Sequence, residues 1–85
     1  MARVKIFSTA RCPICVKTKA LLKKWQIPYV EAMVDSDHGA LREMSEITQG
    51  ARTVPQIVID GKWIGSFSEL TMLHMDDELD EFVEA

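Results

Sequence analysis

Near its start, the chain has a helical segment that lies between two strand-like runs. Residues 4–7, VKIF, alternate apolar and polar side chains as a strand does, and residues 29–34, YVEAMV, form a second such run. Between them, Pro13 suits the first turn of a helix, and apolar residues recur at helical spacing as far as Trp25. A strand, a helix and a strand in this order close into a parallel pair of strands through a right-handed crossover.

The residues that follow predict a second helix and a hairpin. Asp37 is a plausible cap for a helix over residues 40–49, and Gly50 is the kind of residue that ends one. Asp60 and Gly61 separate two apolar runs, which is a strong signal for a β-hairpin. Because a hairpin adds antiparallel strands to the parallel pair, we expect an α/β domain with a small mixed sheet and helices on its faces.

The last part of the chain predicts one or two further helices. Ser66 and Glu69 have the spacing of a capping box, in which two residues cap the start of a helix reciprocally. Residues 76–83 predict a short acidic helix. Its apolar side chains are expected to pack inward: Leu79, Phe82 and Val83.

The chain has the size and composition of one small globular domain, which we expect to span residues 1–85. Apolar residues make up 47% of it and charged residues 27%, which is ordinary for a soluble protein. No apolar run approaches the roughly 20 residues that cross a bilayer, and the first residues lack the apolar core of a secretory signal. We therefore expect a cytoplasmic protein that does not bind a membrane. We also expect it to be a monomer.

Basic and acidic residues are distributed unevenly along the chain. Residues 1–30 hold seven Lys or Arg and no Asp or Glu, whereas residues 31–85 hold three basic and thirteen acidic residues. The basic residues do not form the aromatic-interleaved patch of a nucleic-acid-binding protein, so we expect no nucleic-acid partner. Together they raise the potential around a pair of cysteines, which favours a thiolate and anionic ligands. Five of them lie near that pair: Arg11, Lys17, Lys19, Lys23 and Lys24.

Cys12 and Cys15 could form a structural staple, part of a metal site or a redox pair. A disulfide between them would close a loop of only four residues and would need an oxidising compartment. A zinc site would need further ligands at close spacing, but the only two histidines, His38 and His74, are isolated in the sequence. We therefore expect no metal site, and a C-x-x-C pair beside a βαβ pattern indicates redox chemistry.

The expected position of the pair gives its two sulfurs different roles. Cys12 would lie at the N-terminus of the helix that starts at Pro13, near unpaired backbone N–H groups and the positive end of the helix dipole. Positions of this kind stabilise a thiolate, and Arg11 and Lys19 would act in the same direction. Cys15 would lie inside the first turn and be less exposed. We therefore expect Cys12 to be the nucleophile and Cys15 to resolve the mixed disulfide.

A second motif supports this interpretation. Residues 50–70, GARTVPQIVIDGKWIGSFSEL, together with CPIC at residues 12–15, resemble the glutaredoxin family, and the match runs nearly from end to end. The resemblance implies an α/β thioredoxin-like fold, with a four-stranded mixed sheet flanked by helices. It also implies glutathione-dependent thiol–disulfide exchange, with the redox pair at Cys12 and Cys15. Glutathione would be a co-substrate, and no cofactor would be bound permanently.

The resemblance assigns glutathione-binding roles to residues far from the cysteines in the sequence. In Thr53-Val54-Pro55 it implies a cis proline beside the active-site cysteines, and backbone groups of Val54 that bind the cysteinyl part of glutathione. The γ-glutamyl end would be bound by the backbone N–H of Ser68, at a helix N-terminus, and by the carboxylate of Glu69. The capping box competes for Glu69, so the role of this residue stays open between ligand and cap.

Basic residues complete the implied site. Arg42 matches a position where the family uses Arg or Gln near the glycine carboxylate of glutathione, and Lys19 matches a lysine that supports the site electrostatically.

The sequence departs from the family pattern at three positions: Thr9 in place of a basic residue, Ile14 in place of an aromatic residue, and Ser66 in place of a glycine. Arg11 or Arg42 would compensate for the missing basic residue.

The family resemblance implies reduction of glutathionylated proteins and of disulfide proteins such as ribonucleotide reductase. Two alternatives remain open. A glutaredoxin-like redoxin would take its electrons from thioredoxin reductase and would lack the glutathione-binding elements. An iron–sulfur carrier would form a dimer that shares a cluster through Cys12 and glutathione, although such carriers generally have one active-site cysteine, and Pro13 should hinder that dimer.

Overall fold

The computed structural model describes residues 3–83, in which one four-stranded sheet is combined with three α-helices and a short 3-10 helix. The elements follow in the order β1 (Val4–Ser8), α1 (Pro13–Lys24), β2 (Tyr29–Met33), α2 (His38–Ile47), β3 (Gln56–Ile59), β4 (Lys62–Gly65), α3 (Phe67–Met75) and η1 (Asp80–Phe82). The strands are arranged β2-β1-β3-β4, with β1 and β2 parallel and the other two pairs antiparallel. The predicted α/β fold with a four-stranded mixed sheet is confirmed.

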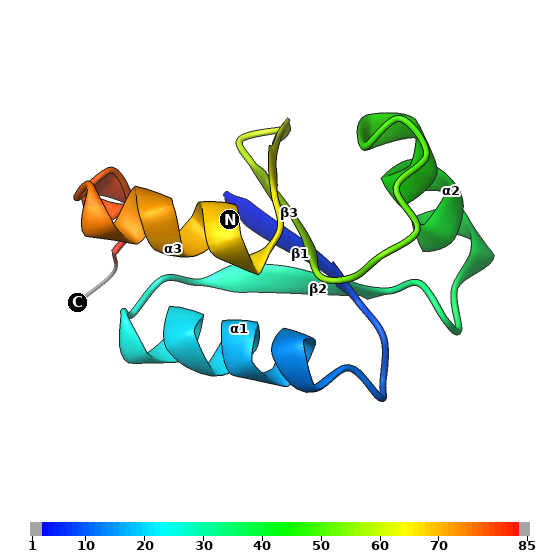
Figure 1. The fold of residues 1–85 in the computed structure, drawn as a ribbon, viewed down its shortest axis with the longest axis horizontal. Coiled ribbons are helices and arrows are strands. Elements are labelled where there is room, and N and C mark those ends of the chain that lie inside the picture. Colours follow the sequence, from blue (N-terminus) through cyan, green and yellow to red (C-terminus); the bar gives the residue numbers. More distant parts are fainter. Residues whose placement is uncertain (1–2, 84–85) are drawn as a thin grey trace.

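Helices cover both faces of the sheet. Figure 1 shows α1 and α3 side by side, with α2 apart from them across the strands. The buried side chains form two clusters, because successive residues of a strand point to opposite faces. The cluster on the side of α1 and α3 includes Ile6, Leu22, Ile57 and Leu70. The cluster against α2 comprises Phe7, Val34, Ala40, Met44 and Val58.

The first two helices both have a capped first turn: α1 begins at Pro13 as predicted, and α2 begins after the predicted cap Asp37, two residues before the predicted start. Pro13 is the first residue of α1, and the sulfur of Cys12 accepts a hydrogen bond from the backbone N–H of Cys15 (3.0 Å). Asp37 caps α2 by accepting from the backbone N–H of Ala40 (3.1 Å). Each cap satisfies one of the N–H groups that a helix leaves without an internal partner. Four residues lead from β1 to α1, and four lead from β2 to α2.

The end of α2 lies two residues before the predicted one. The helix ends at Ile47, and the hydroxyl of Thr48 donates to the carbonyl oxygen of Met44 (2.6 Å) and accepts from the backbone N–H of Ala51 (3.1 Å). The hydroxyl of Thr48 thus links the last helical turn to the residues that follow it. Gly50 follows with a φ of 94°, a conformation that suits glycine at a helix terminus.

Asp60 and Gly61 form the predicted turn between β3 and β4. Both residues have positive φ, 53° and 79°, as a tight hairpin turn requires. The side chain of Asp60 also accepts from Arg3 Nε (2.7 Å), which joins the turn to the residue before β1. The hairpin prediction is confirmed.

The predicted acidic helix over residues 76–83 is wrong in its extent. The chain turns at Asp77, which has a φ of 59°, and only Asp80–Phe82 form one turn of 3-10 helix. Carboxylates at the C-terminal end of α3 oppose the helix dipole, which explains why that helix does not continue. Leu79 is buried and Phe82 packs against the core as predicted, but Val83 is 39% exposed. One short turn presents only one side to the core.

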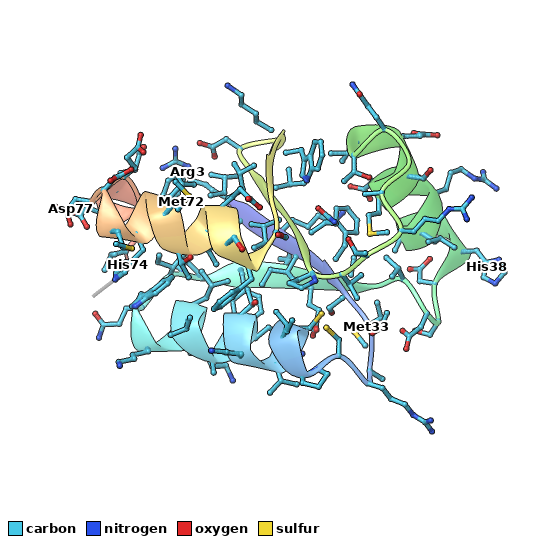
Figure 2. The ribbon with its side chains drawn as sticks, in the orientation of Figure 1. Arg3, Met33, His38, Met72, His74 and Asp77 are labelled. Atoms are coloured by element: carbon cyan, nitrogen blue, oxygen red, sulfur yellow. The ribbon has the colours of Figure 1, made fainter. Side chains whose placement is uncertain are left out.

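An aromatic contact joins the ends of α1 and α3. The rings of Trp25 and His74 are stacked, with centroids 3.8 Å apart and planes at 12°. Because such pairs stabilise a fold by about 0.5–1.5 kcal/mol, we expect His74→Ala to lower the free energy of unfolding in urea by about 1 kcal/mol. His38→Ala is the matched control, since His38 is exposed on α2 at the other end of the molecule (Figure 2). An equal loss in both variants would contradict the prediction.

Candidate active site

Cys12 and Cys15 lie where the chain passes from β1 into α1. Both carry free thiols. Cys12 is half-buried at the N-cap position, and its sulfur lies 3.0 Å from the backbone nitrogen of Cys15. Cys15, in the first turn of the helix, is fully buried. The structure therefore places the two sulfurs at the outer and inner positions that the sequence predicts.

The surroundings of Cys15 disfavour its thiolate. Burial, the hydrogen bond with Cys12 and the charge of Cys12 raise the pKa of the Cys15 thiol to about 12. The backbone N–H of Thr9 and the ammonium of Lys19 act in the opposite direction, but they are weaker together. In the reduced protein at neutral pH, the Cys15 sulfur therefore keeps its proton.

The loop before β3 brings Val54 and Pro55 against the first cysteine. The Val54–Pro55 peptide bond is cis, as the family resemblance implies. The thiol of Cys12 donates to the carbonyl oxygen of Val54 at 3.8 Å, although the two residues are 42 positions apart. Thr53 is exposed, and its carbonyl oxygen accepts from the side-chain amide of Gln56 (2.9 Å), which holds the loop in place. The structure thus brings the two sequence motifs together.

Lys19 is tied to β2 by an acidic residue that the sequence analysis missed. Its Nζ donates to Glu31 Oε2 at 2.6 Å, and the same oxygen accepts from the hydroxyl of Ser8 at 2.5 Å. The hydrogen bond between the two charged groups raises the pKa of Lys19 and lowers that of Glu31. The signal that could have indicated Glu31 is an acidic residue within the apolar run of β2.

Glu69 folds back over the start of α3 as a cap. Its Oε1 accepts from the backbone N–H of Ser66 at 2.7 Å and from the Ser66 hydroxyl at 3.0 Å, and these bonds lower the pKa of Glu69. A Cβ at Gly65 would lie 2.5 Å from Oε1, so this position needs glycine, whose φ is 123°. The predicted capping box is confirmed. Ser68 is exposed on the first turn of the same helix.

A pocket of about 470 Å³ lies between α2 and the loop before β3. Thr9, from the end of β1, and Val54 line it together with Arg52. The sequence analysis missed Arg52, although its place two residues before Val54 was a signal. Within residues 3–83, Arg11 and Arg42 do not line this pocket. Arg11 is exposed before α1, and Arg42 is exposed on α2.

A family model described as Glutaredoxin matches residues 4–64, which include both cysteines and the cis proline. The chain belongs to the glutaredoxin family. Glutaredoxins are thiol–disulfide oxidoreductases, and two cysteines spaced as C-x-x-C at the start of α1 are the groups that this chemistry uses. The family resemblance seen in the sequence is confirmed.

Curated glutaredoxins align with nearly the whole chain. A probable glutaredoxin of Synechocystis sp. is 33% identical over 79 residues, which cover 93% of this chain and 90% of that protein. Glutaredoxin 3 of Escherichia coli strain K12 is 36% identical over 80 residues, with 94% and 95% covered. The similarity therefore extends beyond the cysteine motif to the complete fold.

Solved glutaredoxin structures have the same fold. A buckwheat glutaredoxin–glutathione complex matches with a TM-score of 0.81 at 26% identity, and the match covers 95% of this chain and 76% of that one. The dithiolic glutaredoxin of Trypanosoma brucei brucei has a TM-score of 0.81 at 32% identity, with 98% and 88% covered. The thioredoxin-like fold expected for this glutaredoxin is thereby confirmed.

The two histidines lie far apart in the structure. Figure 2 places His38 and His74 at opposite ends of the molecule, so they cannot share a metal ion. Within residues 3–83, no group of three or more His, Cys, Asp or Glu side chains is arranged to hold one. The helices in that part of the chain are all too short or too polar to cross a membrane.

Proposed function

We propose that this glutaredoxin reduces glutathionyl mixed disulfides and protein disulfides with electrons from glutathione. The observation that carries the proposal is the position of Cys12. Its sulfur is half-buried at the N-terminus of α1, accepts the backbone N–H of Cys15 and lies beside Val54. The sulfur of Cys12 is the more accessible of the two, since Cys15 is fully buried, so Cys12 is the nucleophile in this proposal. Cys15, buried behind it, is the resolving cysteine.

The proposed reaction is a series of thiol–disulfide exchanges. The Cys12 thiolate attacks a glutathionylated substrate, which leaves as a thiolate while Cys12 becomes glutathionylated. A second glutathione attacks this mixed disulfide, releases oxidised glutathione and regenerates Cys12. With a disulfide protein such as ribonucleotide reductase, Cys15 attacks the mixed disulfide on Cys12, and two glutathiones then reduce the Cys12–Cys15 disulfide.

Glutathione is proposed to lie across Cys12, between two hollows of the surface. Backbone groups of Val54 would bind its cysteinyl part. A hollow of about 440 Å³ beside Glu69 suits the γ-glutamyl end, with the backbone N–H of Ser68 on the adjoining helix turn. Arg52, in the wall of the 470 Å³ pocket, offers a positive charge to the glycine carboxylate. A solved buckwheat glutaredoxin of the same fold is a complex with glutathione, which supports this arrangement.

Glu69→Ala tests whether the cap is also a ligand. The cap uses Oε1, so the other oxygen, Oε2, can pair with the ammonium group of glutathione. Since charge-assisted bonds contribute about 1.5–3 kcal/mol, we expect the KM for glutathione to rise about tenfold. The lost cap should also lower the free energy of unfolding by about 1 kcal/mol.

Ser66→Gly is the matched control for Glu69→Ala. It removes the hydroxyl contact to the cap but keeps the carboxylate and the backbone N–H. We expect a loss of stability of a few tenths of a kcal/mol, because glycine is nearly as good as serine at an N-cap, and an unchanged KM. If Glu69→Ala lowers stability and leaves the KM unchanged, Glu69 is a cap only.

The choice of electron donor tests the proposed function as a whole. Disulfide reduction is followed as NADPH consumption in two parallel assays, one with glutathione and glutathione reductase and one with thioredoxin reductase. We expect the glutathione assay to be faster. Faster turnover with thioredoxin reductase would replace the proposal with the redoxin alternative. We further propose that the protein acts as a cytoplasmic monomer, which gel filtration and cell fractionation would test.

A further inference from the structure

We propose that Glu31 and Lys19 form a positioning pair that controls how readily Cys15 attacks the mixed disulfide on Cys12. The inference rests on the proposed function, because it concerns the resolving step of that reaction. Lys19 lies one turn beyond Cys15 on α1, and Glu31, on β2, holds its ammonium. Glu31 therefore acts on the sulfur through Lys19.

The contacts of Glu31 keep the ammonium in one place. Its Oε2 accepts from Lys19 Nζ (2.6 Å) and from the hydroxyl of Ser8 (2.5 Å), and Ser8 is fully buried at the end of β1. The side chains of Lys19 and Glu31 are only 25% and 28% exposed, so solvent screens this pair less than a fully exposed one. Tyr29, also on β2, acts on Lys19 in the same direction as Glu31. The ammonium of Lys19, a residue one helical turn beyond Cys15, is thus held at a defined position by Glu31.

The pKa of Cys15 depends on burial and on three residues: Cys12, Thr9 and Lys19. The contribution of Cys12 changes when its sulfur becomes part of a mixed disulfide. In the reduced protein, the hydrogen bond with Cys12 and its charge add to burial in raising the pKa of Cys15. Once Cys12 is part of a mixed disulfide, its sulfur carries no negative charge. The backbone N–H of Thr9 and the ammonium of Lys19 then act against burial, with little opposition from Cys12. The contribution of Lys19 therefore matters most at the resolving step.

Glu31 and Lys19 should have opposite effects on this step. The positive charge of Lys19 stabilises the Cys15 thiolate, whereas the carboxylate of Glu31 compensates that charge. Glu31→Gln keeps an oxygen that can accept from Lys19 but removes the negative charge. Lys19→Gln removes the positive charge. A pair that only stabilised the fold would instead slow the step in both variants.

The test uses dithiobis(nitrobenzoate) in place of a glutathione substrate. The Cys12 thiolate attacks the reagent, whose disulfide is reduced, and one thionitrobenzoate anion leaves. Cys15 then loses its proton to water, and its thiolate attacks the Cys12 sulfur. A second thionitrobenzoate leaves with the electron pair of the broken bond, and the two cysteines are oxidised to a disulfide. With stoichiometric reagent, Cys15→Ser should show the first release only.

The pH profile of the second release reports the ionisation of Cys15 in the mixed disulfide. We expect Lys19→Gln to shift its midpoint by about half a unit to one unit toward alkaline pH, and Glu31→Gln by a similar amount toward acid pH. Below the midpoint, the rate should be about threefold to tenfold slower in the first variant and faster in the second. Glu43→Gln, which breaks the Lys5–Glu43 ion pair (2.8 Å), is the matched control and should leave the profile unchanged.

Shifts in the same direction, or unchanged profiles in both variants, would overturn the proposal. Thermal unfolding of each variant is measured alongside, and if Lys19→Gln does not fold, the direction of the Glu31→Gln shift decides alone. No glutathione enters this assay. If the protein did not use glutathione, the proposed function would be disproved. The pH profile of the second release would still test the Lys19–Glu31 pair.

Discussion

Cys12→Ser is expected to abolish the reduction of glutathionyl mixed disulfides, so that only the rate of glutathione itself remains. A serine hydroxyl is not ionised at neutral pH and cannot form the mixed disulfide through which both routes of the proposed reaction pass. Cys15 cannot take over, because its sulfur is fully buried. The measurement is NADPH consumption with glutathione and glutathione reductase on a glutathionylated substrate.

The same variant is expected to stay folded, which separates its chemistry from its stability. Cys12 has extended backbone angles, φ −104° and ψ 105°, and its sulfur caps α1. Serine is among the best N-cap residues and can accept the same backbone N–H of Cys15. We therefore expect the free energy of unfolding to be unchanged or higher. Activity clearly above the glutathione background would show that another group is the nucleophile.

The parts of the fold that depend on neighbours in the sequence could be predicted. Pro13 begins α1 because its ring suits the first turn, and Asp60 and Gly61 reverse the chain because both accept positive φ. The capping box at Ser66 and Glu69 is likewise a contact between residues three positions apart. Such signals act over a few residues, so they are already present before the chain folds.

Contacts between distant elements could not be predicted in the same way. The Lys19–Glu31 pair depends on the rotation of α1 and on the position of β2 beside β1. Which arginine lines the pocket beside Val54 depends on the path of the loop before β3, and the structure places Arg52 there. The extent of the last helix depended on the turn at Asp77, a residue type with only a moderate preference for positive φ.

The two roles considered for Glu69 show a different limit. A capping box and an acidic ligand for an ammonium group need the same residue at the same distance from the helix start, so the sequence pattern does not separate them. The structure shows the cap through Oε1. Both of these cap bonds are made by Oε1, so the two roles are physically compatible.

Cys15→Ser is expected to separate the two activities of the proposed reaction. Reduction of glutathionyl mixed disulfides should continue, because a second glutathione can attack the modified Cys12 from solvent. Reduction of protein disulfides should fall by about a hundredfold or more, because an intramolecular attack is replaced by a bimolecular one. Both rates are measured in the glutathione-coupled assay, with a glutathionylated peptide and with a disulfide protein as substrates.

The buried position of Cys15 makes the choice of variant important. A serine hydroxyl can accept the backbone N–H of Thr9, which acts on the Cys15 sulfur in the original protein, whereas Cys15→Ala leaves that N–H without this partner. If both variants retain mixed-disulfide activity and lose protein-disulfide activity, the missing sulfur is the cause, because their effects on packing and hydrogen bonding differ. An equal loss of both activities in a folded variant would mean that Cys15 supports the first attack by Cys12, and its assignment as the resolving cysteine would be wrong.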